Sequence, residues 1–210
     1  TGNPSTSLWN QLNWRPSTKQ LDQFVQLQSL LKDWNNQVNL TRLTEGNDYW
    51  ISQVFDSLWP FKNELQNSAQ KFTCVDVGSG CGFPGLAVAI ALPKTQLTLI
   101  ESVSRKTKIL EKISKEIGLD SQTLIVNERV EITAHRPNFR RKFDIAIARA
   151  VANAPIVSEY LIPFLNSQGE ALIYRGKWSQ SNNKELTTAV ETLNANITEI
   201  MRIELPDNRG

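Results

Sequence analysis

A cluster of glycines in the stretch Val75 to Gly85, which reads VDVGSGCGFPG, is the first candidate for a ligand-binding site. Gly80, Gly82 and Gly85 satisfy the pattern G-x-G-x-x-G. Glycine allows the backbone to turn sharply, to approach a ligand closely and to pack a helix against a strand. A tight structural turn is the alternative, but four glycines in the eight residues from Gly78 exceed what a turn needs. The pattern therefore favours a site for a nucleotide-type ligand.

Two carboxylates near the glycines distinguish between such ligands. Glu101 lies about 20 residues beyond Gly80, where an acidic side chain accepts hydrogen bonds from the ribose hydroxyls of an adenosine. NAD and S-adenosylmethionine both contain that adenosine. Asp76 stands two residues before Gly78, so it can face the cationic amino-acid group of S-adenosylmethionine, whereas it would repel the pyrophosphate of NAD. S-adenosylmethionine is therefore the predicted cofactor, and the alternative for Asp76 is a carboxylate that stabilises the loop.

The residues before about Lys71 have the periodicity of amphipathic helices. The first predicted helix follows a Ser17-x-x-Gln20 capping pattern, and its apolar residues recur near helical spacing: Leu21, Phe24, Val25, Leu31, Trp34 and Val38. The second predicted helix stops at Pro60 and contains Ile51, Val54, Phe55 and Leu58. We expect residues 1–70 to form a helical N-terminal cap.

From residue 71 the sequence changes to short runs with strand propensity, separated by helical patterns. The runs read FTCVDV, QLTLIE, TLIV, FDIAIA, EALIYR and ITEIMRIEL. Helical patterns cover residues 85–92 and 104–117, and Gly118 is a predicted C-cap. Such alternation is typical of parallel βαβ units. Residues 71–210 are therefore predicted to form a doubly wound, Rossmann-like α/β domain, with the glycines between its first strand and first helix.

Composition restricts the class of protein. The formal net charge is +2, and no apolar run approaches the roughly 20 residues of a membrane span, so we expect a soluble protein without a membrane partner. Two cysteines, Cys74 and Cys81, and one histidine, His135, have no metal-ligand spacing, so we expect no metal site. No secretory signal is visible at the N-terminus, and a reducing cytoplasm fits best. We expect a cytoplasmic monomer.

Basic side chains gather in two segments. The first set is Arg105, Lys106, Lys108, Lys112 and Lys115, and the second set, around Phe139, is Arg136, Arg140, Arg141 and Lys142. Nucleic-acid phosphates attract such clusters. Solvated faces are the alternative for both sets, and Glu111 and Glu116 beside the first set favour that alternative.

Several segments together resemble one known family. VDVGSGCGFPGL, LIESVSRKTKIL, ERVE, ARA and the upstream WNNQVNLT resemble the RsmG (GidB) family of small-subunit ribosomal RNA guanine-N7 methyltransferases. The resemblance covers nearly the whole chain, and GFPG is its most specific element. It implies a class I S-adenosylmethionine-dependent fold that methylates N7 of one guanine in 16S ribosomal RNA, on naked RNA or on the assembling small ribosomal subunit.

The resemblance also implies residues of the cofactor site, because Gly78, Phe83, Val130, Glu131 and Arg149 fall on family motif positions. Together with the glycine loop and its neighbouring carboxylates, these positions give the candidate cofactor-binding residues: Asp76, Gly78, Gly80, Gly82, Phe83, Glu101, Ser102, Val130, Glu131 and Arg149. Arg149 ends the strand FDIAIA, at the side of the sheet where such folds bind ligands, and is expected to organise the cofactor and the guanine. The alternative is an arginine that caps its own strand end.

The candidates for contact with RNA are Asn39, Arg105, Lys106, Arg140, Arg141, Arg175 and Lys177. We expect one RNA footprint over both basic sets and the N-terminal helices. The chain also departs from the family. Gln53 stands where many members have a histidine, and Arg175-Gly176-Lys177 stands where a lysine-glycine pair is common. The chain also stops near where the family continues into a final strand.

Guanine N7 carries an in-plane lone pair and no proton, so it can attack a methyl sulfonium without a general base. No catalytic residue is therefore assigned, and Arg149 is a candidate for positioning only. The rate enhancement would come mainly from alignment of the two reactants. Two other hypotheses stay open: a methyltransferase that acts on a small molecule or a protein, and a noncatalytic protein that binds S-adenosylmethionine or RNA.

Overall fold

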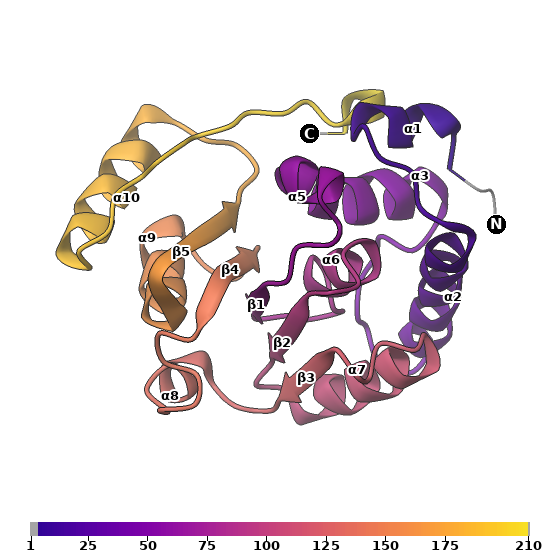
Figure 1. Cartoon of the computed structure of the whole chain (residues 1–210), viewed down its shortest axis with the longest axis horizontal. Helices are drawn as coiled ribbons and strands as arrows, with labels where there is room; N and C mark the ends of the chain where they lie inside the picture. Colours follow the sequence, from indigo (N-terminus) through magenta and orange to yellow (C-terminus); the bar gives the residue numbers. More distant parts are fainter. Residues whose placement is uncertain (1–3, 210) are drawn as a thin grey trace.

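Five parallel strands form the central sheet, in the order β3-β2-β1-β4-β5 (Figure 1). The computed structural model describes residues 4–209. The strands are β1 (Thr73–Val77), β2 (Gln96–Ile100), β3 (Thr123–Val126), β4 (Phe143–Arg149) and β5 (Leu165–Tyr174). Because all five strands are parallel, their carboxyl ends meet at one side of the sheet, which we call the carboxyl edge; the other side is the amino edge. The first five predicted strands are confirmed.

Helices and helical turns account for most of the other described residues. The α-helices are α1 (Thr6–Gln11), α2 (Thr18–Asn35), α3 (Gly46–Tyr49), α4 (Asp56–Leu58), α5 (Lys62–Gln66), α6 (Gly85–Ala91), α7 (Ser104–Glu116), α8 (Val130–Thr133), α9 (Ala154–Leu161) and α10 (Gln180–Thr192). A π-helix, η1 (Trp50–Phe55), and three 3₁₀ turns, η2 (Trp59–Phe61), η3 (Ile162–Phe164) and η4 (Pro206–Asn208), complete the set. Within residues 4–209, no helix combines the length and the apolar character needed to cross a bilayer.

Both faces of the sheet are covered, as a doubly wound fold requires. Cys74 and Leu99 belong to the core shared with α6, α7 and the N-terminal helices. Val75, Val77 and Ile100 instead pack on the other face, in a second cluster that includes side chains of α9. Side chains of a strand point alternately to the two faces, so β1 serves both cores. The predicted α/β class is confirmed.

Glutamine side chains of α2 contact the C-terminal ends of α6 and α7, two helices that pack on the sheet. The capping box predicted at Ser17 and Gln20 is present at the start of α2. The Gln20 amide also donates to the backbone oxygens of Ile90 and Ala91, at the end of α6. Gln23 donates to the Ile117 oxygen at the end of α7, at 2.8 Å. These contacts satisfy carbonyl groups that a helix C-terminus leaves without partners.

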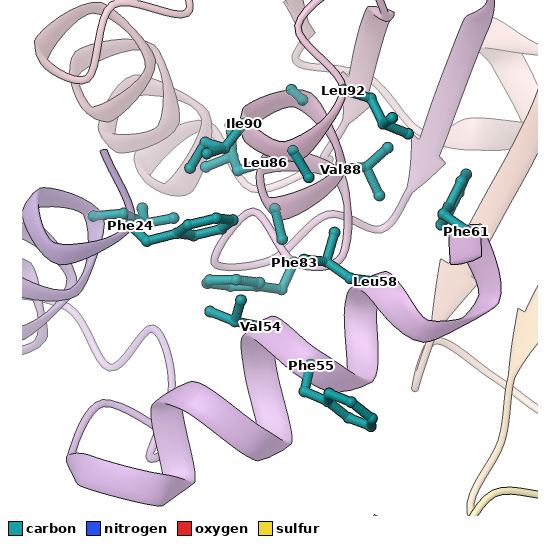
Figure 2. Close-up of a cluster of buried hydrophobic side chains, with 14 of the residues drawn as sticks. Phe24, Val54, Phe55, Leu58, Phe61, Phe83, Leu86, Val88, Ile90 and Leu92 are labelled. Carbon is teal, nitrogen blue, oxygen red and sulfur yellow. The ribbon is translucent and has the colours of Figure 1, made fainter. Parts of the chain in front are cut away.

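One hydrophobic core joins the first 70 residues to the sheet. Phe24 of α2, Val54 of η1 and Leu58 of α4 lie against α6 (Figure 2). Leu86 and Ile90 of α6 are fully buried in the same cluster. The helical cap and the α/β part therefore share a core, and the division at residue 70 stays a prediction.

Pro60 does not end the second helical segment. The chain stays helical from α3 through η1, α4, η2 and α5, so that the segment ends at Gln66. Pro60 lies in the first turn of η2, the short 3₁₀ segment that joins α4 to α5. The predicted stop at Pro60 is therefore wrong. The predicted helices at residues 85–92 and 104–117 are confirmed as α6 and α7, and Gly118 follows α7 with a φ of +72°.

The sixth predicted strand, ITEIMRIEL at residues 197–205, is absent from the sheet, so that prediction is wrong. After α10 this segment crosses to the side of the molecule that holds α1 (Figure 1). It is held there by side chains: Asn47 donates to Asp207 at 2.7 Å, and Arg209 pairs with Asp48. Ile203 packs against the main core. Residues 197–205 therefore have no neighbouring strand with which to form backbone hydrogen bonds, despite their alternating pattern.

Candidate functional site

The glycine loop follows β1 at the carboxyl edge and leads into α6. Gly78, Gly80 and Gly82 have φ values of +68°, +56° and +96°, a region that residues with a side chain rarely adopt. The N–H groups of Gly78 and Ser79 donate to the Ile100 oxygen, so the loop is fastened to the end of β2. A Cβ atom on Gly85 would lie 2.7 Å from Asp76 Oδ2, which explains the glycine at the start of α6.

Asp76 lies under the start of α6 and is 1% exposed. Its Oδ2 accepts a hydrogen bond from the Gly85 N–H at 2.8 Å, which is the loop-stabilising role considered above. Its Oδ1 is buried and has no partner among the described residues. Burial raises the pKa of Asp76 to about 7; the Gly85 N–H and the Arg149 charge lower it, and Glu101 raises it. One oxygen therefore supports the loop, and the other is left for a donor such as an ammonium group.

Glu101 fastens the glycine loop from β2. Its Oε2 accepts from the Gly80 N–H at 3.0 Å, and its Oε1 accepts from the Val103 N–H at 2.9 Å. Each carboxylate oxygen has a further lone pair, which a ribose hydroxyl can use. Asn127, which no sequence motif indicates, donates to the backbone oxygens of Glu101 and Ser102. The end of β2 is thereby held in place beside the loop.

The remaining cofactor candidates differ in what they can offer. Phe83 is 4% exposed and its ring packs edge to face against Tyr49, so only its backbone can reach a ligand. Ser102 is exposed at the carboxyl edge. Val130 and Glu131 begin α8, after β3, at the same edge. The structure thus brings the cofactor candidates together around the ends of β1, β2, β3 and β4.

Arg149 ends β4, but its side chain is held by the N-terminal helical segment. One Nη atom donates to Asp56 Oδ2 at 2.9 Å and to the Ser52 oxygen at 3.3 Å, and the other donates to Gln53 Oε1. Burial raises the pKa of Asp56, and the charge and hydrogen bonds of Arg149 oppose that rise. Arg149 therefore joins the sheet to the cap, and it does not simply cap its own strand. No local pattern in the sequence indicates Asp56 and Ser52 as its partners.

The candidates for contact with RNA fall into two separate groups. Asn39, Arg105, Lys106, Arg175 and Lys177 lie at or beside the carboxyl edge: Arg105 and Lys106 begin α7 after β2, and Arg175 and Lys177 follow β5. Arg105 donates to the backbone oxygen of Gln37, in the same loop as Asn39, at 2.9 Å. Arg175 donates to the Ala152 oxygen, which joins the loops after β4 and β5.

Arg140 and Arg141 lie at the amino edge, because they precede β4. The Arg141 N–H donates to the Pro163 oxygen, just before β5. A strand of five to seven residues separates the two edges by roughly 20 Å. In the same cluster, Arg136 pairs with Glu128. One footprint over both basic sets would therefore have to span both edges of the sheet, and it stays a prediction.

A cavity of about 530 Å³ also lies near the amino edge, remote from the glycine loop. Its lining includes Trp14, Lys19 and Gln122, together with the C-terminal ends of α6 and α7. None of the candidate cofactor-binding residues lines this cavity. We do not assign the cofactor to it.

Comparison with known proteins identifies the family. The GidB family model, described as rRNA small subunit methyltransferase G, matches residues 20–208. A relative named Ribosomal RNA small subunit methyltransferase G, from Prochlorococcus marinus (strain MIT 9313), is 53% identical over 208 residues, which make up 99% of this chain and 84% of the relative. A relative of the same name from Synechococcus sp. (strain CC9902) is 50% identical over 207 residues, or 99% of this chain and 85% of the relative.

A solved structure supports the fold. A putative caffeoyl-CoA O-methyltransferase from Staphylococcus aureus matches with a TM-score of 0.52 at 15% identity, over 79% of this chain and 81% of that one. At this identity the likeness shows the fold alone, which is the predicted class I S-adenosylmethionine-dependent methyltransferase fold. The family model and the identity to relatives over nearly the whole chain show that the protein belongs to the GidB family of rRNA small subunit methyltransferase G.

Proposed function

We propose that this protein transfers the methyl group of S-adenosylmethionine to N7 of a guanine in 16S ribosomal RNA. Family membership supports this proposal and disfavours a small-molecule, protein or noncatalytic role. The observation in the structure that carries it is the glycine loop, which the Glu101 carboxylate fastens at the carboxyl edge through the Gly80 N–H. That arrangement suits an adenosine, whose ribose hydroxyls meet an acidic side chain at this position.

The residues of the loop fit S-adenosylmethionine better than a dinucleotide. The buried, unpartnered Oδ1 of Asp76 suits the ammonium group of the methionine part, and a pyrophosphate would meet unfavourable charge there. Glu101 would accept from the ribose, and the open space beside Gly80 would receive the nucleoside. The cofactor supplies an electrophilic methyl group on a sulfonium.

The chemistry needs alignment and no proton transfer. A bond forms between guanine N7 and the methyl carbon as the carbon–sulfur bond breaks, and S-adenosylhomocysteine leaves with the electron pair of that bond. Holding two reactants in line can supply about 7 to 11 kcal/mol of the barrier reduction. We therefore assign Arg149 and its partners a positioning role. We also propose that the protein works in the cytoplasm as a monomer, on naked RNA or on the assembling small subunit.

The test of this function is a map of N7-methylguanosine in 16S ribosomal RNA. Cells with the protein are expected to contain one modified guanine that cells without it lack. Purified protein with S-adenosylmethionine should restore that modification to RNA or subunits from the deficient cells. Identical maps from both kinds of cell would contradict the proposal, and methylation of another class of molecule would support the alternative.

The carboxyl edge is expected to carry the main phosphate contacts. Lys106→Ala combined with Lys177→Ala should weaken RNA binding and reduce the slope of log affinity against log salt by about 0.7 to 0.9 for each phosphate that is no longer neutralised. The matched control is Arg140→Ala combined with Arg141→Ala, which removes two charges from the amino edge and is expected to leave the slope nearly unchanged. RNA-binding assays at several salt concentrations measure the slope for the wild type and both double variants. An equal reduction in the control would show that RNA also contacts the amino edge.

A further inference from the structure

The Gln53 side chain lies where the N-terminal cap, the glycine loop and the end of β4 meet. Gln53 is 1% exposed, and its side chain uses both ends of its amide. Oε1 accepts from an Nη atom of Arg149 at the end of β4. Nε2 donates to Thr41 Oγ1 at 3.1 Å, and Cys81 Sγ in the glycine loop lies 3.8 Å from it. One amide thus touches the cap, the glycine loop and the sheet.

The backbone around Gln53 is organised for these contacts. Gln53 belongs to η1, a π-helix, and such helices are rare and occur frequently at functional sites. The neighbouring Ser52 oxygen and the Asp56 carboxylate accept from the same guanidinium. Gln53 is therefore one of three acceptors that fix the plane and direction of the Arg149 side chain. An arginine with several acceptors is held in one geometry, because its donors form a rigid planar fork.

On the other side, Gln53 supports the loop that carries Asn39. Thr41 lies in the middle of this loop, residues 36–45, which we call the Thr41 loop, and the N–H groups of Leu40 and Thr41 both donate to Asn35 Oδ1. Arg105, at the start of α7, donates to Gln37 in the same loop. The position of the loop over the carboxyl edge thus depends on α2, on α7 and on Gln53.

We propose that Gln53 is a positioning residue for methyl transfer, which acts by orienting Arg149 and by fixing the Thr41 loop relative to the glycine loop. This inference rests on the proposed function, because it assumes that the glycine loop holds the methyl donor and that the RNA approaches over the Thr41 loop. Alignment of the two reactants then depends on a side chain that touches neither of them.

The first test replaces the amide with a side chain of similar length that makes no hydrogen bonds. Gln53→Met is expected to lower kcat about 10- to 100-fold at saturating S-adenosylmethionine, because it removes an acceptor from a charged group. The KM for RNA should change much less. The matched control is Gln23→Met: Gln23 is 9% exposed, lies in the same cap and donates to the Ile117 oxygen at the C-terminal end of α7 at 2.8 Å, away from the Thr41 loop. An equal fall in kcat for the control, or none for Gln53→Met, would overturn the inference.

A second test asks whether Gln53 acts through Arg149. If it does, Gln53→Met combined with Arg149→Met should be about as slow as Arg149→Met alone, because the effects of coupled residues do not add. A double variant whose loss equals the two single losses multiplied would overturn the inference. S-adenosylmethionine affinity, measured by calorimetry on each variant, identifies any variant whose loss reflects a damaged cofactor site.

A third variant keeps the test valid if Gln53→Met folds poorly. In Gln53→His, a neutral imidazole can accept from Arg149 and donate to Thr41, so kcat at pH 8 should stay within about threefold of wild type. A protonated imidazole has two donors and no acceptor, so kcat should fall below the imidazole pKa. That pKa lies near 6.5 in peptides, Arg149 and burial lower it, and the Asp56 carboxylate opposes that lowering. A histidine variant with the wild-type pH profile of kcat would overturn the inference.

The failures of the two proposals can be distinguished. A wild-type protein that methylates no ribosomal RNA would overturn the proposed function, and this inference with it. A wild-type protein that methylates ribosomal RNA, together with a Gln53→Met variant that does so at the same rate, would overturn only the role of Gln53.

Discussion

Gly80→Ala is expected to abolish S-adenosylmethionine binding while the protein stays folded. Gly80 has a φ of +56°, a conformation that costs an alanine about 1–2 kcal/mol. The nearest atom to a Cβ on Gly80 lies 3.8 Å away, so the fold itself accommodates the methyl group. The same open space, beside the Glu101 carboxylate, is where we place the nucleoside of the cofactor. The methyl group would occupy that space and prevent close approach to the backbone.

Gly118→Ala is the matched control for this prediction. Gly118 has a φ of +72°, and no atom lies within 4 Å of a Cβ placed on it, so the two substitutions impose similar strain. Gly118 follows α7, away from the glycine loop. Calorimetry should give normal S-adenosylmethionine binding for Gly118→Ala, no binding heat for Gly80→Ala, and no binding of NAD to the wild type. Normal binding by Gly80→Ala would mean that the loop is only a structural turn.

The glycine loop and its carboxylates could be predicted because their signals are local. The strand, the glycines and the helix start are consecutive in the chain, and Glu101 ends the next strand. Parallel strands that neighbour each other place their ends together, so consecutive βαβ elements were enough to assemble Asp76, Gly80 and Glu101. The same topology also places Arg140 and Arg141 at the amino edge, because they come before β4. Charge alone did not convey that position.

The partners of Arg149 could not be predicted, because they depend on packing between distant segments. Asp56 and Gln53 lie more than 90 residues before Arg149 in the chain. These residues contact Arg149 only because η1 and α4 pack beside the end of β4. No local sequence pattern indicates that η1 is a π-helix. Likewise, the alternation in residues 197–205 predicts a strand, but pairing requires a neighbour, and side chains near Asp48 hold the tail elsewhere.

Asp76→Asn is expected to weaken S-adenosylmethionine binding about 10- to 100-fold at pH 8, because a charge-assisted hydrogen bond to the ammonium group is removed. The asparagine keeps an oxygen that can accept from the Gly85 N–H, so the loop should stay in place. Unchanged affinity would assign Asp76 to loop stabilisation alone.

The pH dependence of the same two proteins gives a sharper test. Burial raises the pKa of Asp76 to about 7 in the folded protein, and the ammonium group requires the ionised form. Wild-type affinity should therefore fall about tenfold for each pH unit below 7 and level off above it, whereas Asp76→Asn should show no such change. Calorimetry in buffers of different ionisation enthalpy should also detect proton release when the wild type binds near pH 6.5. A flat wild-type profile would contradict the ammonium contact.

Stability should change with pH in the opposite direction to affinity. The pKa of Asp76 is about 7 when folded and near 3.9 when unfolded, so the folded state binds an extra proton between these values. The contribution of Asp76 to wild-type stability should therefore decline as pH rises from about 4 to about 7, by up to about 4 kcal/mol, and stay constant above that range. Asp76→Asn lacks this decline, so its stability relative to wild type should increase over the same range. Urea unfolding at pH 5 and pH 8 measures the difference. An unchanged difference would show that Asp76 keeps its charge when buried, and the predicted fall in cofactor affinity below pH 7 would then disappear as well.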